Sequence, residues 1–462
     1  MNEIPLRHLA RYSEIISIFL RYGLGYFVLE NIPLPPILGL GRSNRRYSET
    51  ELGGIGVRLR GALTELGPTF IKLGQLACTR SDLIAQPIIK ELTQLQNQVR
   101  PLPFATIRQL VETSLQQRLD TIFLEFNPIP LAAASIAQVH QAVLKTGEKV
   151  VVKVQRPHLR EIAEIDLEIF GFLIVQFEQR TEWGKSYPLQ TIFREFSRTL
   201  LEELDFLNEG KNTEKLTQYN KTFIIPKIYW EFSTASVLTQ EFIPGTPLRQ
   251  MVNVQSSSLE HNLSLIAEQL CQGILHQILI VGYFHGDPHP GNILILPDGK
   301  IALIDFGIVG TLTNSMRHQL ADLIDSLIAK KNDRLLQVIA QMGIIPEQMD
   351  RTQFLQDISG MRSKYLLNPQ SRGGLGEAIQ DFFNIINDHR IYIPSEYVLI
   401  AKCLLTLEGI LHQMDPNLSL VGQIKPYTRR LLWDKFNPIR FLTRITKTLF
   451  PLNPFLPINR KG

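Results

Sequence analysis

A short polar loop followed by a hairpin pattern constrains the fold of this 462-residue chain more than any other feature. The loop holds Asp287 and Asn292 five residues apart, and Asp305 follows thirteen residues later. Between them, two short apolar runs flank Pro297-Asp298-Gly299, a sequence typical of tight turns. We therefore expect a hairpin that returns Asp305 to the side of the loop, so that three oxygen-bearing side chains meet.

The chemistry of these three side chains predicts a site for magnesium and phosphate. Mg²⁺ is a hard ion that is usually held by one or two carboxylate or amide oxygens together with phosphates and waters. The D-x-x-x-x-N spacing and the following Asp305-Phe306-Gly307 match the catalytic set of protein kinases. We expect Asp287 to be the catalytic base, Asn292 and Asp305 to be metal ligands, and ATP with Mg²⁺ to be the cofactors. The alternative is an unrelated pair of loop acids with a turn asparagine.

Two histidines flank this loop and raise the alternative of a metal cluster. Kinase catalytic loops usually begin with a histidine that anchors the backbone of the loop, so we expect His285 to be structural. The pattern assigns no role to His289.

A lysine on a predicted strand supplies the second part of a nucleotide site. Kinases hold the α- and β-phosphates with a strand lysine paired with a helix glutamate. Residues 149–155 alternate so that Lys153 points away from its valine neighbours. On the next major helix, Asp205 and Glu209 are four residues apart and share a face, whereas Glu203 is turned away from both. We expect Lys153 and Mg²⁺ to supply the cations that the paired carboxylates need; the alternative is an exposed acidic helix face.

The segment before this strand lacks the glycine-rich loop of ordinary kinases. Its place is taken by Ala132, Ala133, Ala134 and Ser135. Alanine restricts the positive φ angles that glycine permits, so we expect a stiffer loop that holds phosphates differently. Farther along, we expect Gln240-Glu241-Phe242 to form the hinge that meets the nucleotide base.

Apolar periodicity divides the chain into a helical start, a β-containing middle and a helical end. We expect a helical segment (1–48), a helical extension (49–125), a small lobe with the alanine-rich loop (126–242), a large helical lobe (243–424) and a basic amphipathic tail (425–462). Strands are expected over 137–143, 149–155, 224–230 and 236–242, and a helix over 189–212. The fold class is α+β, a bilobal kinase-like fold with an N-terminal helical extension and a helical C-terminal region.

With these features in place, the chain resembles the UbiB family of atypical kinases, which contain an AarF domain. The resemblance covers about residues 52–310. It rests on the alanine-rich loop, on Lys72-Leu-Gly-Gln75, which matches a K-x-G-Q motif, and on Glu203-Leu-Asp205, which matches an E-x-D motif. It implies that the K-x-G-Q helix covers the groove where ordinary kinases bind peptides. It further implies that Lys72 pairs with Glu203, that Gln75 reaches toward the phosphates, and that Asp205 belongs to the nucleotide site.

Two departures from ordinary kinases agree with this resemblance. Gly286 replaces the arginine of H-R-D, and no A-P-E motif follows Gly307. We therefore do not expect control by activation-loop phosphorylation. The resemblance implies an ATPase or kinase that supports the biosynthesis or trafficking of isoprenoid quinones or other prenyl lipids.

Three other functions stay open. A small-molecule phosphotransferase is the main alternative, because His-Gly-Asp-Pro-His-Pro-Gly-Asn also resembles the catalytic loop of aminoglycoside and choline phosphotransferases. Those enzymes, however, have no K-x-G-Q extension. A protein kinase is disfavoured if the peptide groove is covered. A nucleotide-gated lipid-binding or scaffold protein is the alternative outside enzymology.

Positive charge gathers at the end of the chain. From Lys425 onward there are nine Lys and Arg residues against one acidic residue, Asp434, although the whole chain has a net charge of only +4. Aromatic and aliphatic residues alternate with these cations, a pattern that suits an anionic membrane surface. The alternative is a last helix that packs on the core with a solvated basic face.

The expected location is the cytoplasm, peripheral to the inner face of the cell membrane. We find no run approaching the roughly 18–20 apolar residues that a spanning helix needs, and so expect no transmembrane helix. The three cysteines are far apart, which argues against disulfides or a zinc site. Expected partners are a nucleotide, a prenylated quinone precursor or an anionic membrane surface, and a second copy of the chain as a homodimer, but no nucleic acid.

Overall fold

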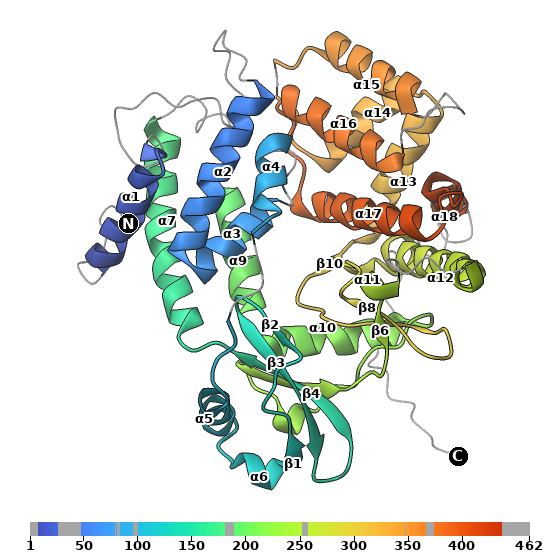
Figure 1. The fold of residues 1–462 in the computed structure, drawn as a ribbon. Coiled ribbons are helices and arrows are strands. Elements are labelled where there is room, and N and C mark those ends of the chain that lie inside the picture. The colour runs from blue at the N-terminus through green and yellow to red at the C-terminus, as the bar shows by residue number, and fades with distance from the viewer. Residues whose placement is uncertain are drawn as a thin grey trace, which may run out of the picture.

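The computed structural model describes residues 8–25, 48–78, 80, 84–95, 100–180, 189–251, 257–346, 348–365 and 374–436. Over these residues it combines small antiparallel sheets with many helices (Figure 1). The largest sheet lies at the lower end of this view, and the N-terminal and C-terminal helices form two groups above it. The expected α+β class is therefore confirmed.

The small-lobe sheet is antiparallel throughout. Its strands lie in the order β1 (Phe123–Phe126), β3 (Ala137–Leu144), β4 (Lys149–Gln155) and β5 (Val237–Glu241), and the short β2 (Ala132–Ala133) pairs with β3. β4 alternates as its sequence predicts, because its central valines are buried while Lys153 lies on the opposite face. The turn before β4 places Gly147 at φ +99°, a conformation that glycine adopts easily.

Two short helices cover one side of this sheet, α5 (Phe104–Leu115) and α6 (Leu119–Ile122). Ile107 and Val111 of α5 are fully buried in an apolar cluster with the valines of β4. α5 thus lies within residues 49–125, which the sequence assigns to the helical extension, and β1 crosses the boundary at residue 125.

The segment 224–230 does not form the strand that its apolar run predicts. Within it, Ile224 and Ile228 form isolated bridges instead. Pro226 lies between the two bridges and has no N–H to donate, so a continuous ladder cannot run through it. A 3₁₀ helix over Trp230–Phe232 follows.

The helix expected over 189–212 is broken in two. α9 (Leu189–Glu203) ends and α10 (Phe206–Tyr219) begins with Asp205 as its N-cap. The Asp205 carboxylate accepts a hydrogen bond from the N–H of Leu207 at 3.0 Å, which satisfies one of the donors that a helix N-terminus leaves open. The prediction of one continuous helix is therefore wrong, because capping replaces continuation at this residue.

The N-terminal helices share an apolar core with two helices of the small lobe. They are α1 (Leu9–Arg21), α2 (Glu49–Leu66), α3 (Pro68–Ala77) and α4 (Gln86–Leu92), and they pack with α7 (Leu159–Arg180) and α9. α3 begins at Pro68 directly after Gly67, whose φ of +98° separates it from α2. Phe70, Leu73 and Leu76 of α3 are buried, so its apolar face holds this helix against the core.

The large lobe begins with helices and short strands around a hairpin. Its helices are α11 (Leu248–Met251), α12 (Ser257–His276) and a π-helical turn (Gln277–Val281). Its strands are β6 (Thr246–Pro247), β7 (Tyr283–His285), β8 (Ile293–Ile295), β9 (Ile301–Leu303) and β10 (Val309–Thr311). β8 and β9 form the predicted hairpin, with Gly299 at φ +81° in its turn, and β7 pairs with β10. The loop before β8 and the segment after β9 are therefore brought side by side.

Helices make up most of the described chain after β10. They are α13 (Asn314–Ile328), α14 (Asn332–Met342), α15 (Arg351–Tyr365), α16 (Leu375–Asp388), α17 (Ser395–Met414) and α18 (Leu420–Phe436). Together with α12 they enclose the largest apolar core of the molecule. α18 crosses the expected boundary at residue 425, and the rest of the expected tail, from residue 437, lies outside the described residues.

Two helical stretches are long and apolar enough to cross a membrane, Leu263–Val281 and Ser395–Met414. The expectation that no stretch meets this criterion is therefore wrong. Because 56% and 50% of the two stretches are buried inside the fold, they also fit the core helices of a soluble protein and indicate a span only weakly.

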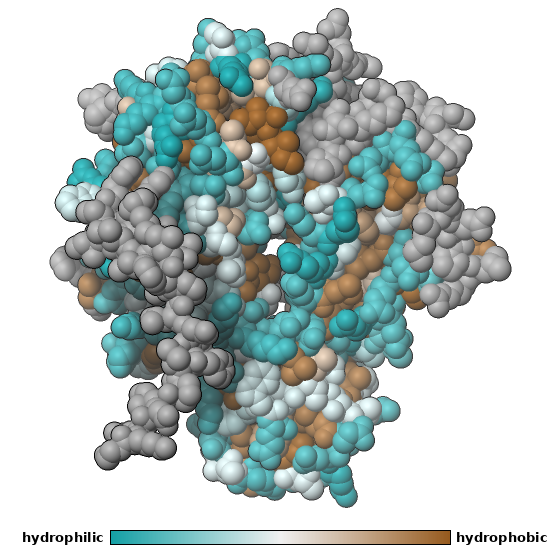
Figure 2. All heavy atoms as spheres, turned by 180° about the vertical axis from the view of Figure 1, so that it is seen from behind, coloured by the Kyte–Doolittle hydropathy of each residue, from teal (hydrophilic) through white to brown (hydrophobic). Residues whose placement is uncertain are grey.

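The surface carries isolated hydrophobic positions. Seen from behind, it is mostly hydrophilic with separate hydrophobic patches (Figure 2). Among the exposed large apolar side chains are Leu265 of α12, which is 56% exposed, and Trp433 of α18, which is 81% exposed. Large exposed aromatic side chains often mark contact surfaces.

Candidate active site

The loop between β7 and β8 is fixed by His285. The N–H of Asp287 donates to Nδ1 of this buried ring at 3.1 Å, and Nε2 lies 3.2 Å from the carbonyl oxygen of Ile304. Burial lowers the pKa of His285, which favours a neutral ring that accepts at Nδ1 and donates at Nε2. The ring therefore ties the loop to the backbone just before Asp305, in line with the structural role predicted for it.

Asn292 closes the other end of this loop. The side-chain Nδ2 of Asn292 donates to the main-chain carbonyl oxygen of Asp287 at 3.3 Å. The main-chain carbonyl oxygen of Asn292 accepts from the N–H of Ile304 at 3.0 Å. Because the NH₂ group faces the backbone, the amide oxygen is the atom of this side chain that can bind a metal ion. Nearby, Nδ1 of His289 accepts from the N–H of Gly291 at 3.0 Å, a contact that holds the local turn.

Asp305 follows β9 in a strained backbone conformation. Its φ is +62°, in the left-handed region that residues other than glycine rarely adopt and that is often found at functional sites. Its Oδ1 accepts from the N–H of Gly307 at 3.3 Å and lies 3.8 Å from Nζ of Lys153. The Lys153 ammonium lowers the pKa of Asp305 to about 2, against the opposing effect of burial. The site therefore presents an ionised carboxylate whose side chain is 49% exposed.

Lys153 of β4 joins the two lobes at this point. Its Nζ lies 2.7 Å from Oε2 of Glu209 on α10 and 5.2 Å from the centroid of the Phe206 ring. Burial alone would lower the pKa of Lys153, but the carboxylates of Asp305 and Glu209 outweigh burial and raise it. Burial also raises the pKa of Glu209 to about 7, although the lysine opposes this shift. A charged lysine is thus shared between two acidic side chains.

Lys72 of α3 forms an ion pair with Glu203, the last residue of α9. The two side chains are only 15% and 11% exposed. Glu203 also lies close to the loop of Asp305, since a Cβ at Gly307 would be 4.0 Å from its Cγ. The pairing that the family resemblance implies is therefore present, and it ties the N-terminal helices to this loop.

The site holds more acidic than basic side chains, so it carries more negative than positive charge once Glu209 is ionised. The two lysines just described face three acidic side chains. A divalent cation at Asp305 would offset the excess. Over the described ranges, no group of three or more His, Cys, Asp and Glu side chains is arranged to hold a metal ion by itself. Mg²⁺ would therefore need Asn292 and phosphate oxygens as further ligands, as is usual for this ion.

The alanine-rich loop is a tight turn between β2 and β3. The N–H of Ala134 donates to the carbonyl oxygen of Ala137 at 2.8 Å, and Arg156 donates to the carbonyl oxygen of Ala134 at 2.9 Å. None of residues 132–135 has a positive φ angle, as predicted for alanine. The Ser135 side chain is 1% exposed, and its hydroxyl has no hydrogen-bond partner within the described structure. A phosphate oxygen is a suitable acceptor for this hydroxyl.

The side chains of Gln75 and Asp205 form hydrogen bonds with the protein backbone. Nε2 of Gln75 donates to the carbonyl oxygen of Leu95 at 3.3 Å, and the Asp205 carboxylate caps α10. The break before α10 also means that Asp205 and Glu209 do not share the face of one continuous helix. The contacts of Gln75 and Asp205 with a nucleotide stay predictions.

The expected hinge lies at the end of β5. The N–H of Phe242 donates to the carbonyl oxygen of Lys149 at 3.0 Å, so this donor already serves the edge between β4 and β5. Oε1 of Gln240 is buried without a hydrogen-bond partner among the described residues. The contact of this hinge with a nucleotide base also stays a prediction.

One residue of the site, Lys402 of α17, is not predicted from the sequence. Its Nζ lies 3.1 Å from Oδ1 of Asp287, and both side chains are 29% exposed. The neighbouring Cys403 contacts the carbonyl oxygen of His285 at 3.5 Å through its Sγ, so α17 packs directly on the loop. The available signal was a single lysine within the otherwise apolar run 397–405.

Comparison with known proteins agrees with this geometry. The model of the ABC1 atypical kinase-like domain matches residues 94–339, and the model of the UbiB helical domain matches residues 358–419. The chain belongs to the ABC1, or UbiB, family of atypical kinase-like proteins. The resemblance drawn from its motifs is therefore confirmed.

Relatives within the family come from bacteria and plants. The chain is 30% identical to the uncharacterized protein sll1770 of Synechocystis over 82% of its own length and 66% of that protein. It is 35% identical to the chloroplastic protein ACTIVITY OF BC1 COMPLEX KINASE 7 of Arabidopsis thaliana, over 81% of its own length and 54% of that protein. The chain is also 32% identical to an uncharacterized protein from the hydrogenase 1 5′ region of Clostridium pasteurianum, over 91% of its own length and 76% of that protein. The match thus spans two thirds or less of the first two proteins.

A solved structure supports the fold. The structure of Rv3197 from Mycobacterium tuberculosis in complex with erythromycin is similar with a TM-score of 0.53 and 25% sequence identity. The similarity covers 68% of this chain and 80% of that chain. Together with the ABC1 match, it confirms the kinase-like fold with a helical C-terminal region.

The ion pair of Lys402 leads to the first prediction. Lys402→Gln removes the cation beside Asp287 without adding bulk, so ATP turnover should fall about tenfold or more. Lys402→Arg should retain part of the turnover, and thermal unfolding should change little. Lys364→Gln is the matched control, because Lys364 also lies 3.1 Å from a carboxylate, Asp381, but on an exposed surface. Equal turnover in Lys402→Gln and Lys364→Gln would contradict a role for Lys402.

The raised pKa of Glu209 predicts that the stability of the fold depends on pH. The folded protein holds the proton of Glu209 up to about pH 7, whereas the unfolded chain releases it near 4.5. This stabilising contribution is present below pH 4.5 and is lost as the pH rises through 7. Relative to Glu209→Gln, the wild type should therefore lose unfolding free energy as the pH rises across this range. Denaturant unfolding at several pH values measures the difference, and a pH-independent difference would refute the assignment.

Proposed function

We propose that this chain is a Mg²⁺-dependent ATPase or atypical kinase that binds ATP and supports the biosynthesis or trafficking of isoprenoid quinones or other prenyl lipids. The proposed location is the cytoplasmic face of a membrane, with the chain bound peripherally. The family and its kinase-like fold are the background of the proposal. Its details rest on the contacts of the site.

The shared lysine is the observation that carries the proposal. Phosphoryl transfer in kinases requires the pair of strand lysine and helix glutamate together with a Mg²⁺-binding aspartate. Lys153 meets Glu209 at 2.7 Å and Asp305 at 3.8 Å, so a single ammonium group bridges both parts. This arrangement, with the strained backbone of Asp305, supports Mg²⁺-ATP as the ligand.

The position of α3 favours an acceptor other than a peptide. α3 is held by its buried apolar face and by the ion pair of Lys72 with Glu203. This double attachment supports a covered peptide groove. The family resemblance supplies the lipid part of the proposal.

Two alternatives remain distinct in their requirements. The catalytic loop, residues 285–292, favours a small-molecule phosphotransferase as the second candidate, because its sequence also fits those enzymes. Such an enzyme would require a soluble acceptor. A nucleotide-gated lipid-binding scaffold would bind Mg²⁺-ATP without turnover.

ATP turnover with and without lipid tests the proposal. We expect anionic liposomes and a phenolic quinone-precursor mimic to stimulate turnover. Asp305→Asn should reduce it by at least about 100-fold, because the carboxylate that binds Mg²⁺ is lost. Turnover that depends on a soluble acceptor would support the phosphotransferase instead. Failure of the wild type to bind any Mg²⁺-nucleotide would refute the proposal.

Weakening the attachment of α3 tests the covered groove. Lys72→Ala should raise autophosphorylation, because α3 then loses its ion pair with Glu203 and exposes the groove more often. The exchanged pair Lys72→Glu with Glu203→Lys is the control, since it restores opposite charges and should bring the rate back toward that of the wild type. Radiolabel incorporation from ATP measures the rate. An unchanged rate in Lys72→Ala would argue against a covered groove.

A further inference from the structure

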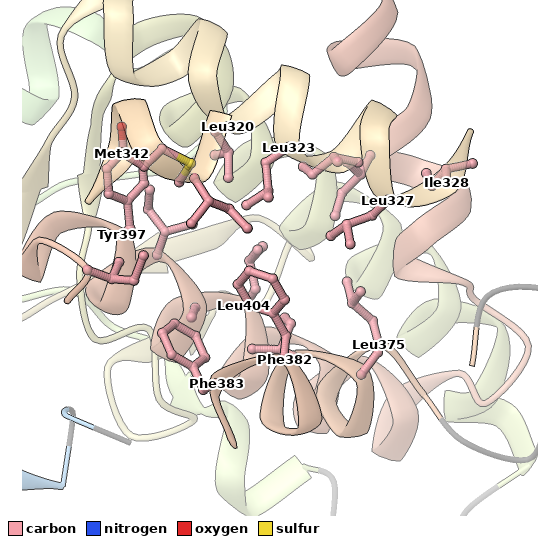
Figure 3. A pocket seen from close by; sticks show the side chains of 18 of the residues that line it. Leu320, Leu323, Leu327, Ile328, Met342, Leu375, Phe382, Phe383, Tyr397 and Leu404 are labelled. Atoms are coloured by element: carbon pink, nitrogen blue, oxygen red, sulfur yellow. The ribbon is translucent and has the colours of Figure 1, made fainter. Parts of the chain in front are cut away.

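A cavity in the C-terminal helices is separate from the nucleotide site. Twenty side chains from α13 to α18 and the segment before α17 line it, and its volume is about 140 Å³. Figure 3 shows side chains from α13 on one side and α16 on the other, facing a central space. The cavity lies between helices of the ABC1 domain match and helices of the UbiB helical domain match.

The lining is chemically uniform. Nineteen of the twenty side chains are aliphatic, phenylalanine or methionine, and the remaining one is Tyr397. The hydroxyl of Tyr397 donates to Oε1 of Gln319 at 2.6 Å, so its polar atom is already satisfied. A ligand inside this cavity therefore meets carbon and sulfur surfaces, and only a hydrocarbon group suits them.

The size of the cavity fits part of a hydrocarbon chain. An apolar cavity of about 150 Å³ in another protein stays dry and binds benzene. The present cavity is of that order and therefore accommodates a few chain carbons. Side chains at one end, Leu327, Ile328 and Leu375, are only half-buried, so this end of the cavity lies nearest the surface. A longer hydrocarbon chain would extend outward at this end.

The sequence of α18 indicates that this hydrocarbon chain belongs to a membrane lipid. Val421 of α18 lines the cavity and is half-buried. Lys425, Arg429 and Trp433 follow at intervals of four residues, so each lies next to the one before it on the helix surface, and all three are exposed. Basic residues with an exposed tryptophan are typical of helices that lie on anionic membrane surfaces. The basic stripe thus begins beside the cavity.

We propose that this cavity binds the hydrocarbon chain of a lipid taken from an anionic membrane surface on which α18 rests. The headgroup stays outside, because the lining offers it no polar partner. The inference deepens the proposed function, since it names the part of a lipid that is bound and the place where it binds. It rests on that function only for the choice between an isoprenoid and an acyl chain, and its test uses no ATP.

Binding of cis-parinaric acid, a fluorescent fatty acid, to the full chain tests the cavity. Ala378→Phe fills the cavity from α16 and should weaken binding by at least about tenfold, with a thermal unfolding temperature at or above that of the wild type. Leu265→Phe is the matched control, because Leu265 is exposed on α12 and does not line the cavity. Displacement of the probe by farnesol or by palmitate distinguishes an isoprenoid from an acyl chain.

A second variant and a label protect the test against misfolding. Ile328→Glu places a charge at the half-buried end and should also weaken binding. If both variants unfold, a diazirine-bearing fatty acid is crosslinked to the wild type, and labelled peptides should come from α13, α16 and α17. Absence of binding by the wild type, binding unchanged in both folded variants, or label only outside these helices would overturn the inference.

The membrane contact is tested separately. The charge-reversed variant Lys425→Glu with Arg429→Glu should lose cosedimentation with mixed phosphatidylcholine and phosphatidylglycerol vesicles. It should still bind cis-parinaric acid in solution. The wild type should bind vesicles of phosphatidylcholine alone only weakly. Equal vesicle binding by the wild type and this variant would overturn α18 as the membrane contact, whatever the ATP turnover of either protein.

Discussion

The candidate active site depends on one buried ammonium group that two acidic side chains share. Lys153 is only 14% exposed, and it lies between Glu209 from α10 and Asp305 from the hairpin. Removing one partner of such a buried pair typically costs about 3–5 kcal/mol, because the remaining charge loses its counter-charge. The strand, the helix and the hairpin therefore have to meet at this point. The remaining excess of negative charge, to which Glu203 contributes, makes the site suited to a divalent cation that arrives with a nucleotide.

Two further lysines reach the site from outside the ABC1 domain match. Lys72 comes from the helices that precede residues 94–339, and Lys402 comes from the helices that follow them. Lys72 meets Glu203, and Lys402 meets Asp287. Ordinary kinases gain control of their catalytic loop from an activation segment, which this chain lacks in its usual form. Here both added helical regions are attached to the candidate active site by ion pairs, so the packing of those regions sets the position of its acidic residues.

The sequence predicted what is encoded locally and missed what depends on packing. The alternation of β4, the hairpin turn at Gly299 and the spacing of Asp287 and Asn292 are local patterns, and the structure has the strand and the hairpin as predicted. The helix break at Asp205 was missed because the same residue can continue a helix or cap the next one, and tertiary contacts decide between them. Lys402 lies 115 residues after Asp287, and only the packing of α17 brings the two together.

α17 connects the candidate active site with the proposed lipid cavity. Ala401 and Leu404 line the apolar cavity, whereas Lys402, between them in sequence, turns toward Asp287. A helix moves as a rigid element, since its backbone hydrogen bonds resist local bending. A hydrocarbon chain that enters the cavity and displaces α17 would therefore change the distance from Lys402 to the loop of Asp287. Lipid binding and phosphate chemistry would then be coupled through a single helix, without any contact between the lipid and the nucleotide.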